Sequence, residues 1–143
     1  MKAILIISSI TIIALLVSCQ SPKEDTMVLL DEKVKTINIL ESKGFSEMNT
    51  EILQSFTDEK SIRVFENAIT TSKKQAVKID VSEPEYDLMV EYESVEGELP
   101  THAIHLWLGE ENERSTLMYI EGEEVYLTTP AITQKLRTLL IKE

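Results

Sequence analysis

Residues 86–93 carry the pattern that most limits what this chain folds into. Apolar and aromatic side chains at positions 86, 88, 90 and 92 alternate with those of Asp87, Met89, Glu91 and Glu93. A period of two residues is typical of a strand in an antiparallel sheet that has one face on a core and the other in water. The segment therefore predicts a sheet covered on one side, with Asp87 on the solvated side.

The rest of the chain predicts further strands and two helices. The expected strands cover residues 33–40, 51–56, 86–93, 103–108, 116–121 and 125–128, and the turn at residues 121–124 joins the last two as a hairpin. These elements follow one another in the order β-β-α-β-β-β-β-α. Adjacent strands interrupted by two helices predict an α+β domain with a mainly antiparallel sheet of about five to six strands.

The first helix is expected over residues 58 to 74, with Asp58 or Thr57 as its N-cap. Its apolar side chains fall on one stripe at helical spacing: Ile62, Phe65, Ala68 and Ile69. Lys73 and Lys74 then stand at its C-terminus, where the helix dipole favours cations. A closing helix begins at Pro130 after the cap Thr129, and its buried stripe is Ile132, Leu136, Leu139 and Leu140.

The strand over residues 103–108 carries apolar side chains on both faces. Ile104, Leu106 and Leu108 share one face, and Ala103 and Trp107 share the other. Two arrangements of the helices satisfy this pattern. Either one helix covers each face, or both cover the same face and leave Trp107 partly exposed.

The N-terminus predicts export and lipid attachment. An apolar run over residues 3–17 follows the single charge of Lys2, and it is shorter than the roughly 20 residues of a membrane-spanning helix. It ends in Leu16-Val17-Ser18-Cys19, which resembles the lipobox of bacterial lipoproteins. In that class a peptidase cuts directly before the cysteine, whose thiol carries diacylglycerol. The alternative is an uncleaved helix with a chance cysteine.

The lipobox resemblance implies a domain plan and a location. Residues 1–18 would be a signal peptide, residues 19–28 a tether with its lipid on Cys19, and residues 29–143 a single domain on the outer face of the cell membrane. Because Cys19 is the only cysteine, the domain has no internal disulfide, and its stability has to come from its core.

Charge restricts the partners. Without Lys2, 13 basic residues stand against 25 acidic ones, a net side-chain charge of −12. Nucleic acid and anionic lipid headgroups bind basic surfaces, so neither is an expected partner. The acidic balance fits a cationic partner, or a solvated surface that keeps an exported protein soluble.

A succession of short motifs resembles the YhfM-like domain of small lipoproteins from Bacillus and its relatives. The succession begins with the helical stripe of Ile62 and ends with the leucine-rich closing helix. Between them stand VKIDVSEPEY at residues 77–86, HLWL at 105–108, TLM at 116–118 and VYL at 125–127. The resemblance covers residues 61–141. It implies an α+β lipoprotein of a Gram-positive cell membrane, and it transfers no catalytic residue. Gln75-Ala76 stands where a glycine is expected after the first helix.

No motif in the chain carries catalytic, cofactor or metal chemistry. His102 and His105 are the only histidines, and positions three apart in a strand point to opposite faces, which separates them as metal ligands. If His102 lies in the turn before the strand instead, their geometry is open. The acidic run Glu110-Glu111-Asn112-Glu113 lacks the alternating ligands and central glycine of a calcium loop. Neither a nucleophile elbow nor a glycine-rich phosphate loop occurs in the sequence.

One candidate partner-binding surface remains. If Leu106 and Leu108 face the core, His105 and Trp107 share the opposite face, and pairing of the last hairpin would bring Tyr119 and Tyr126 next to them. An exposed aromatic patch suits a sugar, a peptide or a protein. The alternative is that the closing helix covers these side chains and makes them part of the core.

Three functions are compatible with these features. The leading hypothesis is a non-enzymatic binding or interaction module, held to the membrane by its lipid and facing a protein, peptide or cell-wall ligand. The second is a small cell-envelope hydrolase that uses carboxylates, with His105 as an additional group. The third is a structural or stress-related surface protein whose essential feature is its anchor.

Overall fold

The computed structural model describes residues 25–45 and 47–142. In these ranges seven strands form one sheet in the order β2-β1-β4-β5-β6-β7-β3, and every neighbouring pair is antiparallel. The strands are β1 (Val34–Glu41), β2 (Ile52–Phe56), β3 (Lys73–Lys74), β4 (Tyr86–Tyr92), β5 (His102–Trp107), β6 (Thr116–Tyr119) and β7 (Tyr126–Leu127), and the helices are α1 (Glu59–Thr71) and α2 (Pro130–Leu140). The expected α+β class is confirmed, and the strand count is higher than expected.

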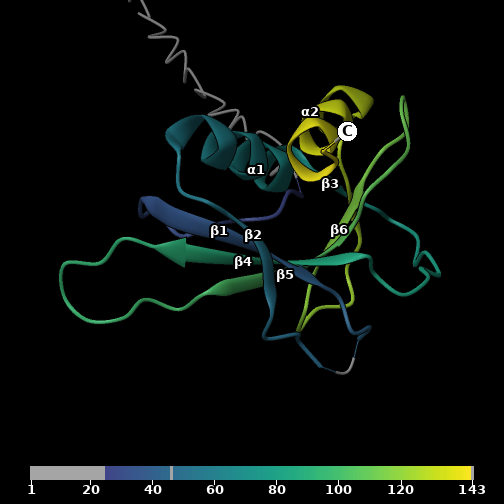
Figure 1. The fold of residues 1–143 in the computed structure, drawn as a ribbon. Coiled ribbons are helices and arrows are strands. Elements are labelled where there is room, and N and C mark those ends of the chain that lie inside the picture. The colour runs from purple at the N-terminus through teal and green to yellow at the C-terminus, as the bar shows by residue number, and fades with distance from the viewer. Residues whose placement is uncertain (1–24, 46, 143) are drawn as a thin grey trace, which may run out of the picture.

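Both helices lie on the same face of the sheet, where Figure 1 shows α1 and α2 next to each other. Their apolar stripes and the apolar side chains of the strands form a single buried core, which includes Phe65, Ile69 and Leu136 from the helices and Leu88, Ile104 and Leu106 from the strands. Each large apolar side chain buried there contributes about 1.5–3 kcal/mol. Of the two expected arrangements, the one that leaves Trp107 partly exposed on the other face is therefore correct.

The two helices begin where the capping residues place them. The carboxylate of Asp58 accepts a hydrogen bond from the Ser61 amide at 2.9 Å, and the Thr129 hydroxyl accepts one from the Ile132 amide at 3.3 Å. These bonds satisfy amides that have no partner within the first helical turn. Of the two caps expected for α1, Asp58 is the one used.

The C-terminal end of α1 differs from expectation. The helix stops at Thr71, Ser72 has extended backbone angles, and Lys73 and Lys74 form the edge strand β3. Lys73 pairs with Leu127 of β7 on one side and makes a β-bridge to Thr26 on the other. Pairing with two distant segments outweighs the local preference of lysine for a helix C-terminus. This strand is the one that was not among the six expected ranges.

Residues 25–30, here called the N-terminal strap, belong to the folded body. Met27 is 1% exposed and lies in the core, and the hydroxyl of Tyr119 accepts from the Val28 amide at 2.7 Å and donates to the Val28 carbonyl at 2.8 Å. The body therefore begins before residue 29, the expected start of the domain. The expected signal peptide, Cys19 and the first part of the tether lie outside the described residues. Within the described ranges, no helix has the length and apolar character needed to cross a membrane.

Candidate functional site

The face of the sheet opposite the helices, here called the back face, carries a row of buried side chains. The row is Leu40, Asp87, His105 and Met118, from β1, β4, β5 and β6, and its members are direct partners in the strand register. Residues directly opposite in neighbouring strands project to the same side and have Cβ atoms about 4.5–5.5 Å apart. The register therefore places an acid and a histidine next to each other in the middle of an otherwise apolar row.

Asp87 and His105 form a buried pair. Nδ1 of His105 lies 2.6 Å from Oδ1 of Asp87, and the side chains are 2% and 0% exposed respectively. Which of these two atoms donates the hydrogen bond is set by the tautomer of His105. The other two polar atoms, Nε2 of His105 and Oδ2 of Asp87, are buried without a hydrogen-bond partner. Asp87 was expected on a solvated face, so its complete burial corrects that expectation.

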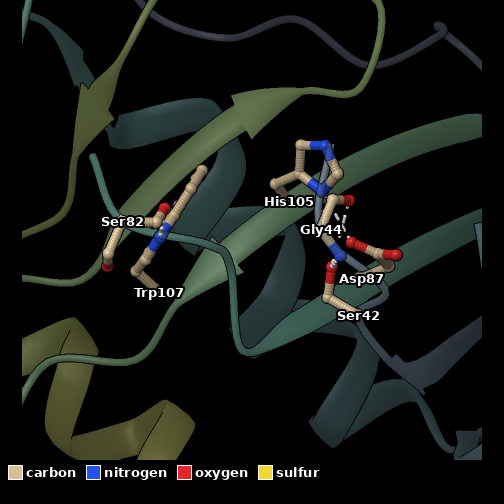
Figure 2. A network of polar contacts seen from close by, with 6 residues as sticks. All are labelled: Ser42, Gly44, Ser82, Asp87, His105 and Trp107. Carbon is tan, nitrogen blue, oxygen red and sulfur yellow. Dashed lines mark hydrogen bonds and ion pairs between the residues drawn. The ribbon is translucent and has the colours of Figure 1, made fainter. Parts of the chain in front are cut away.

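Two aromatic rings enclose His105 and are here called the aromatic cap: Phe45 and Trp107. The Phe45 ring meets the His105 ring edge-on at 5.5 Å between centroids, and the Trp107 centroid lies 5.9 Å from that of His105 and 6.1 Å from that of Phe45. Figure 2 shows His105 and Trp107 projecting from one strand, with Asp87 and Gly44 beside His105. Burial of the acid–histidine pair therefore depends on the loop after β1 as well as on the sheet.

The ring of Trp107 is held in place by the segment between β3 and β4. Its Nε1–H donates to the backbone carbonyl of Ser82 at 2.8 Å (Figure 2). Trp107 has thus used its only polar group, and its ring presents only apolar surface. Phe45 makes no such bond and is 49% exposed, so it is the more open half of the aromatic cap.

A groove of about 580 Å³ adjoins the aromatic cap. Its lining is Phe45, Met118, Val81, Ile79 and Val125, with Lys78, Asp80, Gly122 and Glu123. Met118 and Val125 are buried, whereas Phe45 and Ile79 are exposed, and Lys78 and Glu123 form an ion pair at 3.8 Å. A volume in the range of about 300–1,000 Å³ with few polar groups is typical of a small-molecule site.

The structure does not bring the four predicted surface residues together. His105 and Trp107 lie on the back face, whereas Tyr119 pairs with Ile104 and Tyr126 with Leu117, which places both tyrosines on the helix-covered face. Tyr126 is 6% exposed. Its burial and, to a smaller extent, the hydrogen bond that its hydroxyl donates to Glu124 raise the pKa of Tyr126 to about 12. The expected aromatic patch is therefore two separate pairs, because the register of β6 turns its odd-numbered side chains toward the helices.

The two histidines also lie on opposite faces of the sheet. His102 is on the helix side, where its Nδ1 and the Tyr92 hydroxyl are hydrogen-bonded at 2.6 Å. The strand spacing predicted this separation. In residues 25–45 and 47–142, no group of three or more histidine, cysteine or acidic side chains is arranged to hold a metal ion. The acidic run beginning at Glu110 forms a tight turn in which the Glu113 amide donates to the Glu110 carbonyl at 3.0 Å.

Sequence reasoning found His105 and Trp107 and missed Asp87 and Phe45. Asp87 looked like one member of a solvated acidic row, and only its register partner His105 shows otherwise. Phe45 follows Gly44 in a loop and carries no periodic signal. A residue-by-residue alignment of β4 with β5 would have placed Asp87 opposite His105 and so indicated its burial.

Comparison with solved structures gives a fold relationship. A thioesterase-like protein from Clostridium sporogenes, known from its crystal structure, is similar with a TM-score of 0.59, covering 77% of this chain and 96% of that one. The two are 15% identical, so the likeness concerns the fold alone. The curated proteins contain no match to the chain. The model of the YhfM protein family matches residues 30–143, a wider region than residues 61–141. The chain therefore belongs to the YhfM family.

Proposed function

We propose that this protein is a lipid-anchored binding module on the outer face of the cell membrane, and that its ligand contacts the aromatic cap on the back face. The observation that supports this most is the buried pair of Asp87 and His105, which has an unpaired polar atom on each side chain. Unpaired buried polar atoms destabilise a fold, so each calls for an explanation, and a functional role is one of these. Phe45 and Trp107 beside them supply the aromatic surface that binding sites favour.

A binding role fits the surroundings of His105 better than covalent catalysis. An enzyme of the nucleophilic type places a hydroxyl or thiol within hydrogen-bond reach of its basic nitrogen. In the described part of the chain, Nε2 of His105 has no hydrogen-bond partner. Among residues 25–45 and 47–142, no hydroxyl or thiol therefore lies within hydrogen-bond reach of Nε2 for His105 to activate.

The lipobox-like sequence supports the anchor, and the strap fixes where the chain enters the folded body. If Cys19 carries the lipid, residues 20–24 separate it from the described body, and five residues span at most about 18 Å when fully extended. Two acyl chains on that cysteine give a stable attachment, whereas one gives only a marginal one. The folded body would then lie close to the membrane surface.

Photo-crosslinking on intact cells tests the binding module. The full chain carries p-benzoylphenylalanine at position 45, or at the fully exposed Val95 as the matched control. We expect a reproducible adduct from position 45 and none from position 95, and we expect Trp107→Ala to abolish it while the melting temperature stays close to that of the parent. An adduct that Trp107→Ala leaves unchanged, or no adduct at position 45, contradicts the proposal.

A hydrolase that uses His105 is the second candidate, and the Asp87–His105 hydrogen bond favours it. A carboxylate that holds Nδ1–H leaves Nε2 as a base able to take a proton from water. Turnover of ester, thioester or peptide substrates by the full chain, abolished in His105→Gln, would establish this candidate. A substrate panel without turnover, at protein concentrations that allow crosslinking at position 45, would exclude it in favour of binding alone.

A further inference from the structure

We infer that residues 77–81 and the groove beside them bind an extended, basic peptide, which pairs with their backbone and places an apolar side chain in the groove. The inference rests on the proposed binding function and names its ligand. Residues 77–81, here called the VKIDV segment, lie between β3 and β4. Phe45 lines the same groove and also caps His105, so this peptide would occupy the part of the back face proposed above for the ligand.

The VKIDV segment has the sequence pattern of a strand but pairs with none. Its β-branched side chains at positions 77, 79 and 81 alternate with Lys78 and Asp80, a period of two residues that is typical of a strand. Residues 78–81 run without a turn or a bend. In the part of the chain that the structure describes, the backbone of the segment makes no hydrogen bond. Its amides and carbonyls are therefore open to a further strand.

Both ends of the VKIDV segment are fixed to the sheet. Two residues before it, the Gln75 amide donates to the Val125 carbonyl at 2.8 Å. Directly after it, the Ser82 carbonyl accepts from the Nε1–H of Trp107 at 2.8 Å (Figure 2). The backbone between these two bonds is held in place before a ligand arrives, which reduces the conformational entropy that binding costs. The segment is therefore a prepared edge for a peptide.

The groove of about 580 Å³ supplies a pocket beside this edge. Four successive residues, 78 to 81, line it, so the backbone of the segment runs along one wall. Phe45 and Ile79 in the lining are 49% and 39% exposed, so apolar surface lies in water there. A strand added to an open edge gains affinity from main-chain hydrogen bonds and specificity from pockets for its side chains. An apolar side chain of the peptide reaches this groove without any change in the buried acid–histidine pair.

The charges of the groove favour a basic peptide over an acidic one. Lys78 and Glu123 form the ion pair at 3.8 Å, and Asp80 is the third charged side chain of the lining. One basic and two acidic side chains give the lining a net charge of −1, in a chain whose net charge is −11. A lysine or arginine beside the apolar residue of the peptide would meet Asp80, whereas the chain as a whole repels an acidic peptide.

Nuclear magnetic resonance with defined peptides tests the site. The ¹⁵N-labelled full chain, in a zwitterionic detergent, is titrated with three capped heptapeptides in which lysine alternates with valine, leucine or phenylalanine. We expect at least one of them to shift the amide resonances of the VKIDV segment and of Phe45, and to leave those of Val95 and of α1 unchanged. No shift in the segment with any peptide at millimolar concentration, or equal shifts at Val95, overturns the inference.

Two analogues of the bound peptide separate backbone pairing from charge. N-methylation of two adjacent central residues removes a donor facing the segment in either register, because successive amides of a strand point to opposite edges. We expect this change to weaken binding by about tenfold or more. Replacement of every lysine by glutamate keeps the backbone and the apolar side chains and should abolish binding. Undiminished affinity of either analogue overturns the inference.

Variants of the groove supply the third readout. Ile79→Ser should weaken peptide binding by about tenfold, because it removes apolar surface that the peptide covers. Asp80→Asn should weaken it less, and only for the basic peptides. Val95→Ser, at a fully exposed position outside the groove, is the matched control and should bind as the parent does. Because both groove side chains are exposed, the melting temperature should stay close to that of the parent. Undiminished affinity in both groove variants overturns the inference.

The crosslinking experiment separates this inference from the function on which it rests. Mass spectrometry of the adduct at position 45 identifies the captured molecule, and a polypeptide together with peptide binding at the VKIDV segment supports both. An adduct with a lipid or a glycan overturns the peptide and keeps the binding module. Peptide binding without an adduct on cells keeps the peptide site and contradicts the proposed function. Neither adduct nor peptide binding overturns both.

Discussion

At the scale of single residues, β5 places two identical side chains in two different environments. His105 is buried on the back face against Asp87, whereas His102 is half-buried on the helix side against Tyr92. The sequence alone predicted that the two point apart, because side chains alternate along a strand. It did not predict their partners, since these come from a neighbouring strand whose register only the tertiary structure sets.

His102 should make the stability of the protein depend on pH. Burial lowers the pKa of His102 below its usual value of 6.5, so the folded state binds fewer protons than the unfolded state. Its contribution is fully present above pH 6.5 and is lost as the pH falls through the folded pKa. We expect the melting temperature to be lower at pH 5 than at pH 8. The part of this decrease that is due to His102 should be absent in His102→Gln.

The His105→Gln variant is the matched control for this pH effect. It changes the same residue type in the same strand, on the other face of the sheet, and leaves the Tyr92–His102 contact in place. The component of the slope due to His102 should therefore persist. An unchanged slope in His102→Gln would show that burial of His102 does not govern the titration.

At the scale of elements, α2 is attached to the sheet by buried hydroxyls as well as by its apolar stripe. The Ser115 amide donates to the hydroxyls of Thr128 at 2.9 Å and Thr133 at 2.8 Å, and the Ser115 and Thr133 hydroxyls lie 2.9 Å apart. All three residues are at most 1% exposed. This cluster joins the start of α2 to the loops that flank β6 and β7.

Thr133→Val should destabilise the protein by about 1–3 kcal/mol, because it keeps the side-chain shape and leaves buried partners on Ser115 and Thr128 with fewer hydrogen bonds. Thr138→Val is the control on the same helix. The hydroxyl of Thr138 is exposed and donates only to the Gln134 carbonyl of its own helix, so its loss should be nearly neutral. Denaturant unfolding measures the free energy of unfolding of both variants. Equal losses in the two would show that the buried hydroxyl cluster does not stabilise the protein.

The elements themselves were largely predictable, and their ends less so. Period-two alternation located β4, and the caps Asp58 and Thr129 located both helix starts, because these signals lie within one element. Lys73 and Lys74 were expected in a helix and form β3. Their pairing with β7 and with Thr26 joins distant segments, and no local pattern reports it.

At the scale of the whole molecule, the N-terminal strap is tied to the sheet edge and to the core. Thr26 bridges to the edge strand at Lys73, Met27 enters the core, and Val28 is held through its backbone by Tyr119. A force applied at the N-terminal end of the strap would therefore reach the sheet directly. The strap also extends the sheet edge at β3, where the backbone would otherwise be unpaired.

Met27→Ala should cost about 2–5 kcal/mol, the range for removing most of a buried methionine side chain from a core. Val28→Ala, one residue further and 68% exposed, is the control and should be nearly neutral. Chemical denaturation of the full chain in detergent compares the two. Similar small effects would show that the strap packs on a body that is stable without it.

Periodicity and caps in the sequence determined the α+β class, both helices and most strands, because those signals depend on each element alone. Its lipobox also predicts the anchor, through four residues at the end of an apolar run. Only the tertiary structure decided which face of each strand meets which neighbour. It buried Asp87 against His105 and separated Tyr119 and Tyr126 from Trp107, because strand register and covering loops are set by contacts between residues far apart in the chain.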